Sequence, residues 1–342
     1  MAEPVSARIH GTAATSPTAV VAVGETMIML VPEEGTSLET TRQFTSHIGG
    51  AESNVAMYLA RLGVPVRWAS VMRDDPLGRR IATELAESGV DVSAISWRDT
   101  DQTGVYLKDP GPEATTVYYY RQGSAARMIG PTIWQDERLR RAAVLHLTGI
   151  TPALSASANE AIEAAVVGRE TGAALVSFDI NYRPGLWSVE TAAPVLQRLA
   201  DAADIVFVGL DEAERLWGCT TPAEVREALP TAPTIIVKDG ATGAHALAGD
   251  REIFVPSLVV EVVEPVGAGD AFAAGYIKGI VDGRAEAACL RLGHLLAATA
   301  LTVHGDAAQP PSVGWLDSQL EITEKEWAGG AFALMGPKEQ PA

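Results

Sequence analysis

Short, mainly apolar runs alternate with longer amphipathic stretches through the middle of the sequence. The apolar runs occupy 143–147, 174–179, 204–208 and 234–238, and helical patterns near 155–171, 189–201 and 211–217 separate them. A strand that is apolar on both faces must be buried between two layers. The alternation therefore predicts an α/β fold, in which a mainly parallel central sheet is covered by helices on both sides.

The N-terminal third adds a strand, two helices and two segments that break this rhythm. A buried first strand is predicted at 20–24, and helices at 51–62 and 76–88 each stop before a glycine. Segments 27–47 and 97–122 are rich in β-forming residues, and we expect them to form a small β-strand lid over one end of the sheet. The expected organisation is a disordered tail at 1–19, one domain at 20–315 and a C-terminal helix and tail at 316–342.

The balance of charge excludes some classes of partner. The 342 residues include 43 Asp and Glu but only 26 Lys and Arg, a net charge of −17. Nucleic acid needs a basic surface, so we expect no such partner, and an anionic ligand would need a local cluster of arginines or amides.

Other classes of site and partner are disfavoured as well. The two cysteines and six histidines show no spacing typical of a disulfide framework or a zinc site. The apolar run at 19–32 is interrupted by Glu25 and is too short to span a bilayer. Residues 1–19 lack the pattern of a signal peptide, so we expect no membrane partner and a cytoplasmic location.

A glycine-rich turn leads directly into a helix of small residues near the C-terminal end. Its residues are Gly267, Ala268, Gly269 and Asp270. Backbone N–H groups at a helix start are unpaired and attract anions, and the glycines leave room for a phosphate. Asp270 would then lie beside that phosphate and could take a proton from an attacking hydroxyl. Helix capping alone also explains an Asp there, and the segment is neither a Walker A loop nor a dinucleotide-binding motif.

This turn resembles the C-terminal signature of the ribokinase-like sugar kinases, the phosphofructokinase-B type. The run Gly-Gly-Ala-Glu-Ser-Asn-Val-Ala at 49–56 resembles their N-terminal signature, and the likeness extends over about 20–310. It implies a ribokinase-like three-layer sandwich and phosphoryl transfer from ATP with Mg²⁺. It also implies that Asp270 is the catalytic base and that the amides of Gly267, Ala268 and Gly269 form an anion hole.

Within that family the chain is most similar to the 2-keto-3-deoxygluconate kinases, through the stretches at 103–107, 119–125, 146–155 and 179–187. The resemblance implies a sugar-acid site made of Gly50, Asn54, Tyr106, Tyr120, Arg121 and Arg183. Guanidinium groups offer forked donors that suit a carboxylate, which agrees with two arginines in the set. The tyrosines could instead form a packing face, and either arginine could be a solvated surface charge.

The residues predicted to bind the nucleotide resemble those of the family less closely. A turn after a buried strand resembles the ATP-binding turn of the family, and its candidate residues are Lys238, Gly240 and Gly243. Glu212 matches the last residue of an element that positions magnesium, although Gly209 replaces its Asn. His294 stands where related kinases often carry Asn near the adenine, although a core or surface histidine is the more frequent explanation for such a residue. We expect Mg²⁺ to arrive with ATP and to keep most of its waters.

Two other functions stay open on the sequence. A kinase for a neutral sugar such as fructose or ribose would not need two arginines in its pocket. A sensor that has lost turnover would explain Gly209 and His294, but not an intact Asp270 turn. The choice between the gluconate and galactonate epimers is left open. Homo-oligomers that pair through the lid strands are expected from the family.

Overall fold

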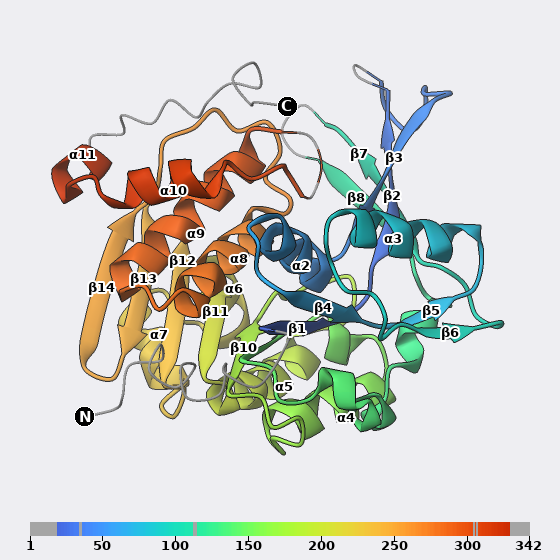
Figure 1. Cartoon of the computed structure of the whole chain (residues 1–342), viewed down its shortest axis with the longest axis horizontal. Helices are drawn as coiled ribbons and strands as arrows, with labels where there is room; N and C mark the ends of the chain where they lie inside the picture. The colour runs from blue at the N-terminus through green and yellow to red at the C-terminus, as the bar shows by residue number, and fades with distance from the viewer. Residues whose placement is uncertain (1–18, 34–35, 112–114, 304, 306, 329–342) are drawn as a thin grey trace.

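A large, mostly parallel sheet runs through the centre of the molecule (Figure 1). The computed structural model describes residues 19–33, 36–111, 115–303, 305 and 307–328. From one edge to the other, the strands are β14 (Arg251–Pro256), β13 (Gly243–Ala248), β12 (Thr234–Asp239), β11 (Ile205–Gly209), β10 (Leu175–Asp179), β9 (Val144–Thr148), β1 (Val20–Val23) and β4 (Val66–Ala69). All neighbours from β12 to β4 run parallel, and the antiparallel pair β13–β14 closes one edge.

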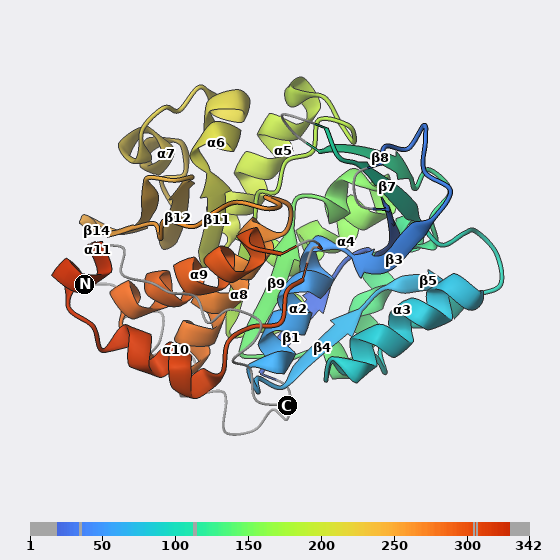
Figure 2. The same cartoon turned by 90° about the horizontal axis from the view of Figure 1, so that it is seen from above.

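Helices cover both faces of this sheet, so the predicted three-layer α/β architecture is confirmed (Figure 2). One face carries α2 (Ala51–Arg61), α3 (Pro76–Glu87), α8 (Ala268–Val281), α9 (Glu286–Leu301), α10 (Val313–Leu320) and α11 (Glu324–Ala328). The other carries α4 (Ala156–Val166), α5 (Val189–Ala202), α6 (Leu210–Trp217) and α7 (Pro222–Ala228). Successive residues of a strand point to opposite faces, so Leu175 packs in the first layer while Val176 packs in the second.

A second, four-stranded sheet stands beside one end of the large one (Figure 1). We call it the small sheet; in order, it contains β3 (Phe44–Gly49), β2 (Met27–Pro32), β7 (Val105–Asp109) and β8 (Thr116–Tyr120). The short strands β5 (Val71–Arg73) and β6 (Ser96–Arg98) pair with each other instead. Trp97 and Arg98, the start of the second predicted lid segment, therefore lie outside the small sheet. The 3₁₀ turns η1 (Ala125–Met128), η2 (Pro131–Gln135), η3 (Glu137–Leu139) and η4 (Thr151–Ala153) lie between β8 and α4.

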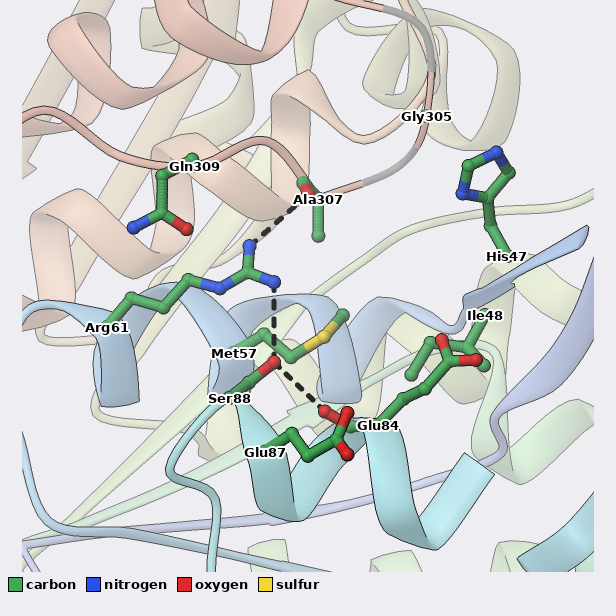
Figure 3. A pocket seen from close by; sticks show the side chains of 10 residues that line it. All are labelled: His47, Ile48, Met57, Arg61, Glu84, Glu87, Ser88, Gly305, Ala307 and Gln309. Carbon is green, nitrogen blue, oxygen red and sulfur yellow. Dashed lines mark hydrogen bonds between the residues drawn. The ribbon is translucent and has the colours of Figure 1, made fainter. Parts of the chain in front are cut away.

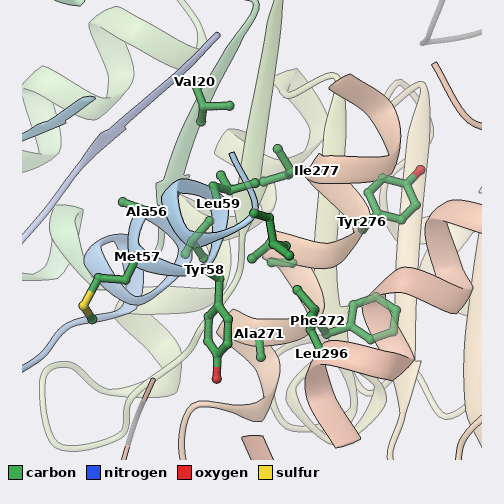
Figure 4. Close-up of a cluster of buried hydrophobic side chains, with 14 of the residues drawn as sticks. Val20, Ala56, Met57, Tyr58, Leu59, Ala271, Phe272, Tyr276, Ile277 and Leu296 are labelled. Carbon is green, nitrogen blue, oxygen red and sulfur yellow. The ribbon is translucent and has the colours of Figure 1, made fainter. Parts of the chain in front are cut away.

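The first layer is held together by the packing of α2, α8 and α9 (Figure 4). Leu59 of α2 and Ile277 of α8 are fully buried in one apolar cluster. A Cβ atom on Gly275 would lie 2.3 Å from the backbone oxygen of Leu292, so only glycine permits this close approach of α8 and α9. This packing fixes the start of α8 beside the start of α2, where the two sequence signatures lie.

The predicted tails fall mostly outside the described residues. Of the segment 1–19, only Ala19 is described, and the C-terminal segment is described as α10 and α11, as far as Ala328. None of the helices in the described ranges combines the length and the apolar character that a bilayer crossing requires.

Candidate active site

The strands β10, β11 and β12 run parallel, and their carboxyl ends lie side by side at one end of the large sheet. The register pairs Asp179 with Phe207 and Gly209 with Lys238, so the residues that follow these strands start side by side. They line a cavity of about 940 Å³, which the small sheet borders through Tyr106 and the 257–272 segment borders through Gly267. Ligands of open α/β sheets bind at such an edge.

Asp270 reaches this cavity from the first turn of α8. Gly267 caps the helix with φ 87°, a left-handed conformation that favours glycine, so the chain turns sharply just before the aspartate. Asn54 Nδ2 donates to one carboxylate oxygen at 2.8 Å and Asn181 Nδ2 donates to the other at 3.3 Å. An ionised carboxylate has only acceptors, so two amide donors suit it. The base predicted from the sequence is thus oriented by two side chains.

Asn181 was not among the residues singled out from the sequence. It is buried and has φ 41°, although it is not a glycine, and its Oδ1 has no hydrogen-bond partner among the described residues. A residue in this sparsely populated region persists only where its surroundings impose it, often at a functional site. Its place just after β10, at the ligand-binding edge, was the available sequence signal.

The predicted anion hole lies beside Asp270. Gly267, Ala268 and Gly269 all line the cavity, at the N-terminus of a 14-residue helix. The first N–H groups of a helix lack intrahelical partners and carry the positive end of its dipole. This end of the cavity therefore suits a phosphate.

Lys238, a residue of the predicted ATP-binding turn at the end of β12, also lies at this end of the cavity. Its Nζ is 3.2 Å from both carboxylate oxygens of Asp179, and a Cβ atom on Gly269 would lie 3.5 Å from the same Nζ. Burial alone would lower the pKa of Lys238, but the carboxylates of Asp179, Glu212 and Asp270 outweigh it and raise that pKa. The site thus holds a protonated amine among three acids, next to the helix start.

Glu212, the predicted metal residue, joins two backbone segments. Its Oε1 accepts from the Tyr182 N–H and its Oε2 from the Gly209 N–H, both at 2.8 Å, and burial raises its pKa. Gly209 is the N-cap residue of α6, and no side-chain hydrogen bond of its own caps the helix there. Within the described ranges, no group of three or more His, Cys, Asp or Glu residues is arranged to hold a metal ion. Each Glu212 oxygen still has a lone pair for a water molecule.

The two arginines of the predicted sugar side have different environments. Arg121 is buried, forms an ion pair with Glu25 and lies over the Tyr119 ring at 5.7 Å. Ser124 donates to the other Glu25 oxygen. Arg183 is exposed where it lines the cavity. The Arg121 charge is therefore compensated by an acid that the sequence did not single out, whereas Arg183 is open to a ligand.

Strand periodicity decides which tyrosines face the cavity. Tyr106 of β7 pairs with Tyr119 of β8 across the small sheet, and both line the cavity. Tyr120 points to the opposite face and is 62% exposed. The structure thus brings Gly50 and Asn54 to the cavity with Tyr106, Arg121 and Arg183, but not Tyr120.

The far end of the cavity is lined by Gly240, Gly243 and His294, the predicted nucleotide residues. His294 is buried, its Nε2 lies 3.0 Å from the carbonyl oxygen of Val255, and its ring meets Phe272 edge-on. Burial lowers the pKa of His294 to about 4, so the ring is neutral near pH 7. The carbonyl can only accept, so the proton is on Nε2 and Nδ1 is an acceptor.

A second hollow, of about 480 Å³, lies between α2, α3 and the segment after α9 (Figure 3). The Arg61 guanidinium on its wall donates to the carbonyl of Ala308 at 2.8 Å and to Ser88 Oγ at 3.3 Å. Glu84 and Glu87 line it as well. It holds none of the residues predicted to be functional, so the larger cavity is the candidate active site.

Comparison with known proteins agrees with this geometry. Residues 17–312 match the model of the pfkB family of carbohydrate kinases. The 2-dehydro-3-deoxygluconokinase of Bacillus subtilis is 35% identical over 316 residues, which cover 90% of this chain and 98% of that protein. The 2-dehydro-3-deoxygalactonokinase of Haloferax volcanii is 33% identical, covering 84% and 92%. The crystal structure of a PfkB protein from Polaromonas sp. JS666 superposes with a TM-score of 0.78 at 35% identity, covering 88% and 99%.

Proposed function

Because the chain belongs to the pfkB family of carbohydrate kinases, we propose that it transfers a phosphoryl group from ATP to the primary hydroxyl of a sugar acid. The substrate that fits best is 2-keto-3-deoxygluconate, which would become 2-keto-3-deoxy-6-phosphogluconate. The observation that carries the proposal is the Asp270 carboxylate, which Asn54 and Asn181 hold at the start of α8 inside the cavity.

Asp270 acts as the general base in this proposal. Its carboxylate takes the proton of the sugar hydroxyl as that oxygen attacks the γ-phosphorus of ATP. The bond from the γ-phosphorus to the β–γ bridging oxygen breaks, and ADP leaves. The amides of Gly267, Ala268 and Gly269 and the Lys238 ammonium face the charge that develops on the transferred group. Fixed donors cost no reorganisation at the moment of reaction, so they stabilise the transition state more than water would.

The nucleotide end of the cavity supports ATP as the donor. Gly240 and Gly243 leave backbone accessible to phosphates, and the neutral His294 ring offers an Nδ1 acceptor beside an adenine. Mg²⁺ bound with ATP supplies positive charge to the phosphates. Both Glu212 oxygens already accept backbone N–H bonds, which fits contact through a metal-bound water rather than direct ligation.

The sugar end of the cavity supports an acid as the acceptor. Arg183 is exposed and lines the cavity of a protein whose net charge is −17. It donates to the carbonyl of Tyr182 at 3.3 Å, and its charge acts on Glu212. Arg121 keeps donors for the substrate while Glu25 fixes its orientation. Gly50, Tyr106 and Tyr119 line the same end. A neutral sugar would leave Arg183 without an anion to bind.

A coupled ADP-release assay over sugar acids and neutral sugars tests the proposal. We expect the acids to be preferred, and Asp270→Asn to bind both substrates while turnover falls about 10²–10⁴-fold. Arg183→Ala should lower kcat/KM for the acid roughly 10–150-fold, the loss of one charge-assisted contact. A preference for fructose or ribose in the wild type would refute the acid assignment. Ligand-induced stabilisation without ADP release from any sugar would instead identify a sensor.

The small sheet has two further roles in this proposal. It acts as a lid that closes over the sugar and keeps water from the phosphoryl group.

The outer face of the small sheet presents Tyr118 and Tyr120, 46% and 62% exposed, to a second copy of the chain in a homo-oligomer. Sedimentation of the wild type and of a Tyr118→Asp/Tyr120→Asp variant measures that association. We propose that the reaction takes place in the cytoplasm, where ATP is available.

A further inference from the structure

A buried ion pair joins the small sheet to the segment that leads into α8. Lys108 of β7 is 2% exposed and Glu264 is 5% exposed, and Lys108 Nζ lies 3.3 Å from Glu264 Oε2. The two residues are 156 positions apart in the sequence. Such a pair is strongly sensitive to the loss of Lys108, because the Glu264 carboxylate would then be a buried charge without its ion-pair partner.

Lys108 lies on the face of the small sheet that borders the cavity. Exposure alternates along β7, and Tyr106 and Lys108 are its two buried residues. Across the sheet Lys108 pairs with Val117, which lines the cavity. Since residues two apart on a strand share a face, Lys108 continues the cavity-facing row that Tyr106 begins.

Glu264 accepts a hydrogen bond from the backbone just before the turn that is predicted to form the anion hole. Its Oε1 accepts from the Val266 N–H at 3.3 Å, while its own N–H and that of Val263 point to the carbonyl of Leu301. Gly267 follows directly after Val266. One carboxylate thus contacts the small sheet with one oxygen and the start of the turn with the other.

We propose that Lys108 and Glu264 are positioning residues for phosphoryl transfer, which join the small sheet to the turn that carries the amides at 267–269. Closing the small sheet over the sugar then also sets the position of the anion hole. The inference rests on the proposed function, because it assigns the turn to the transferred phosphoryl group.

Hydrogen exchange on the ligand-free protein tests the coupling directly. In Lys108→Met, peptides that cover 105–109 and 263–269 should exchange faster together, while a peptide that covers β9 stays unchanged. Lys278→Met is the matched control, since it breaks a Lys–Asp pair at the far end of α8 and should alter neither peptide. Faster exchange at 105–109 alone would overturn the proposal.

Kinetics separate positioning from simple stabilisation. We expect kcat of Lys108→Met to fall roughly 10–100-fold, as a misplaced catalytic group does. The ratio of sugar-independent ATP hydrolysis to sugar-dependent turnover should rise about tenfold or more. Lys108→Arg, which keeps the cation, should restore both values. An unchanged ratio in Lys108→Met would show that the pair only stabilises the fold.

The double variant Lys108→Met/Glu264→Gln guards against loss of folding in the single one. It removes both charges of the pair, so it should unfold at a higher denaturant concentration than Lys108→Met while kcat stays low. Recovery of kcat in this variant would contradict the proposal. A wild-type protein that phosphorylates no sugar acid would refute the proposed function, and the exchange experiment would still decide the coupling, because it needs no substrate.

Discussion

Replacing Lys238 by methionine should lower both the stability of the protein and its turnover. The Lys238 side chain is 20% exposed and that of Asp179 is 2% exposed, with 3.2 Å between Nζ and either carboxylate oxygen. Breaking a buried pair costs about 3–5 kcal/mol, and the partial exposure places this one near 3 kcal/mol. Asp179 would then remain beside Glu212 without its ion-pair partner.

The effect on turnover follows from a different contact. The Nζ lies next to the helix start at Gly269, within reach of a transferred phosphate. A charge-assisted hydrogen bond is worth about 1.5–3 kcal/mol, so kcat/KM should fall roughly 10–150-fold on top of the loss of stability.

The double variant Lys238→Met/Asp179→Asn distinguishes the two effects. Removing both charges should restore most of the free energy of unfolding, measured by denaturant titration, because no uncompensated charge stays buried. Turnover in the ADP-release assay should stay low, because the ammonium is still absent. If turnover recovers with stability, Lys238 only neutralises Asp179, and its assignment to the phosphate is refuted.

Three further outcomes are expected. Asn181→Ala should lower kcat about tenfold or more without changing KM for ATP, since it removes a donor to Asp270; unchanged kcat would show that Asn54 alone orients the base. Tyr119→Ala should raise KM for the sugar acid far more than Tyr120→Ala, and the reverse order would place Tyr120 in the site. Burial lowers the pKa of His146 from 6.5 to about 4, so the unfolded chain binds its proton more readily. The contribution of His146 to stability should therefore be complete above pH 6.5 and fall by roughly 3 kcal/mol towards pH 4. His146→Leu should remove this contribution in unfolding titrations and leave that of His294, whose pKa is lowered in the same way.

The architecture and the glycine turn before Asp270 could be predicted from the sequence alone. Buried strands such as 175–179 need apolar residues on both faces, and that requirement is local, so it can be seen without knowing the partners. The turn at Gly267 is equally local, because its left-handed φ demands a glycine and the helix start follows at once. The assignment of Asp270 to that start needed no information from elsewhere in the chain.

Which side chains surround Asp270 depends on how distant elements pack together. Asn54 and Asn181 lie 216 and 89 positions away in the sequence, and the packing of α2 on α8 and the end of β10 bring them to the carboxylate. Tyr119 rather than Tyr120 faces the cavity because the register of β8 on β7 sets the direction of alternate residues. The pairing of Arg121 with Glu25 was hidden for the same reason: a charge in a sequence does not show its partner, and partners across a fold are set by how its elements pack.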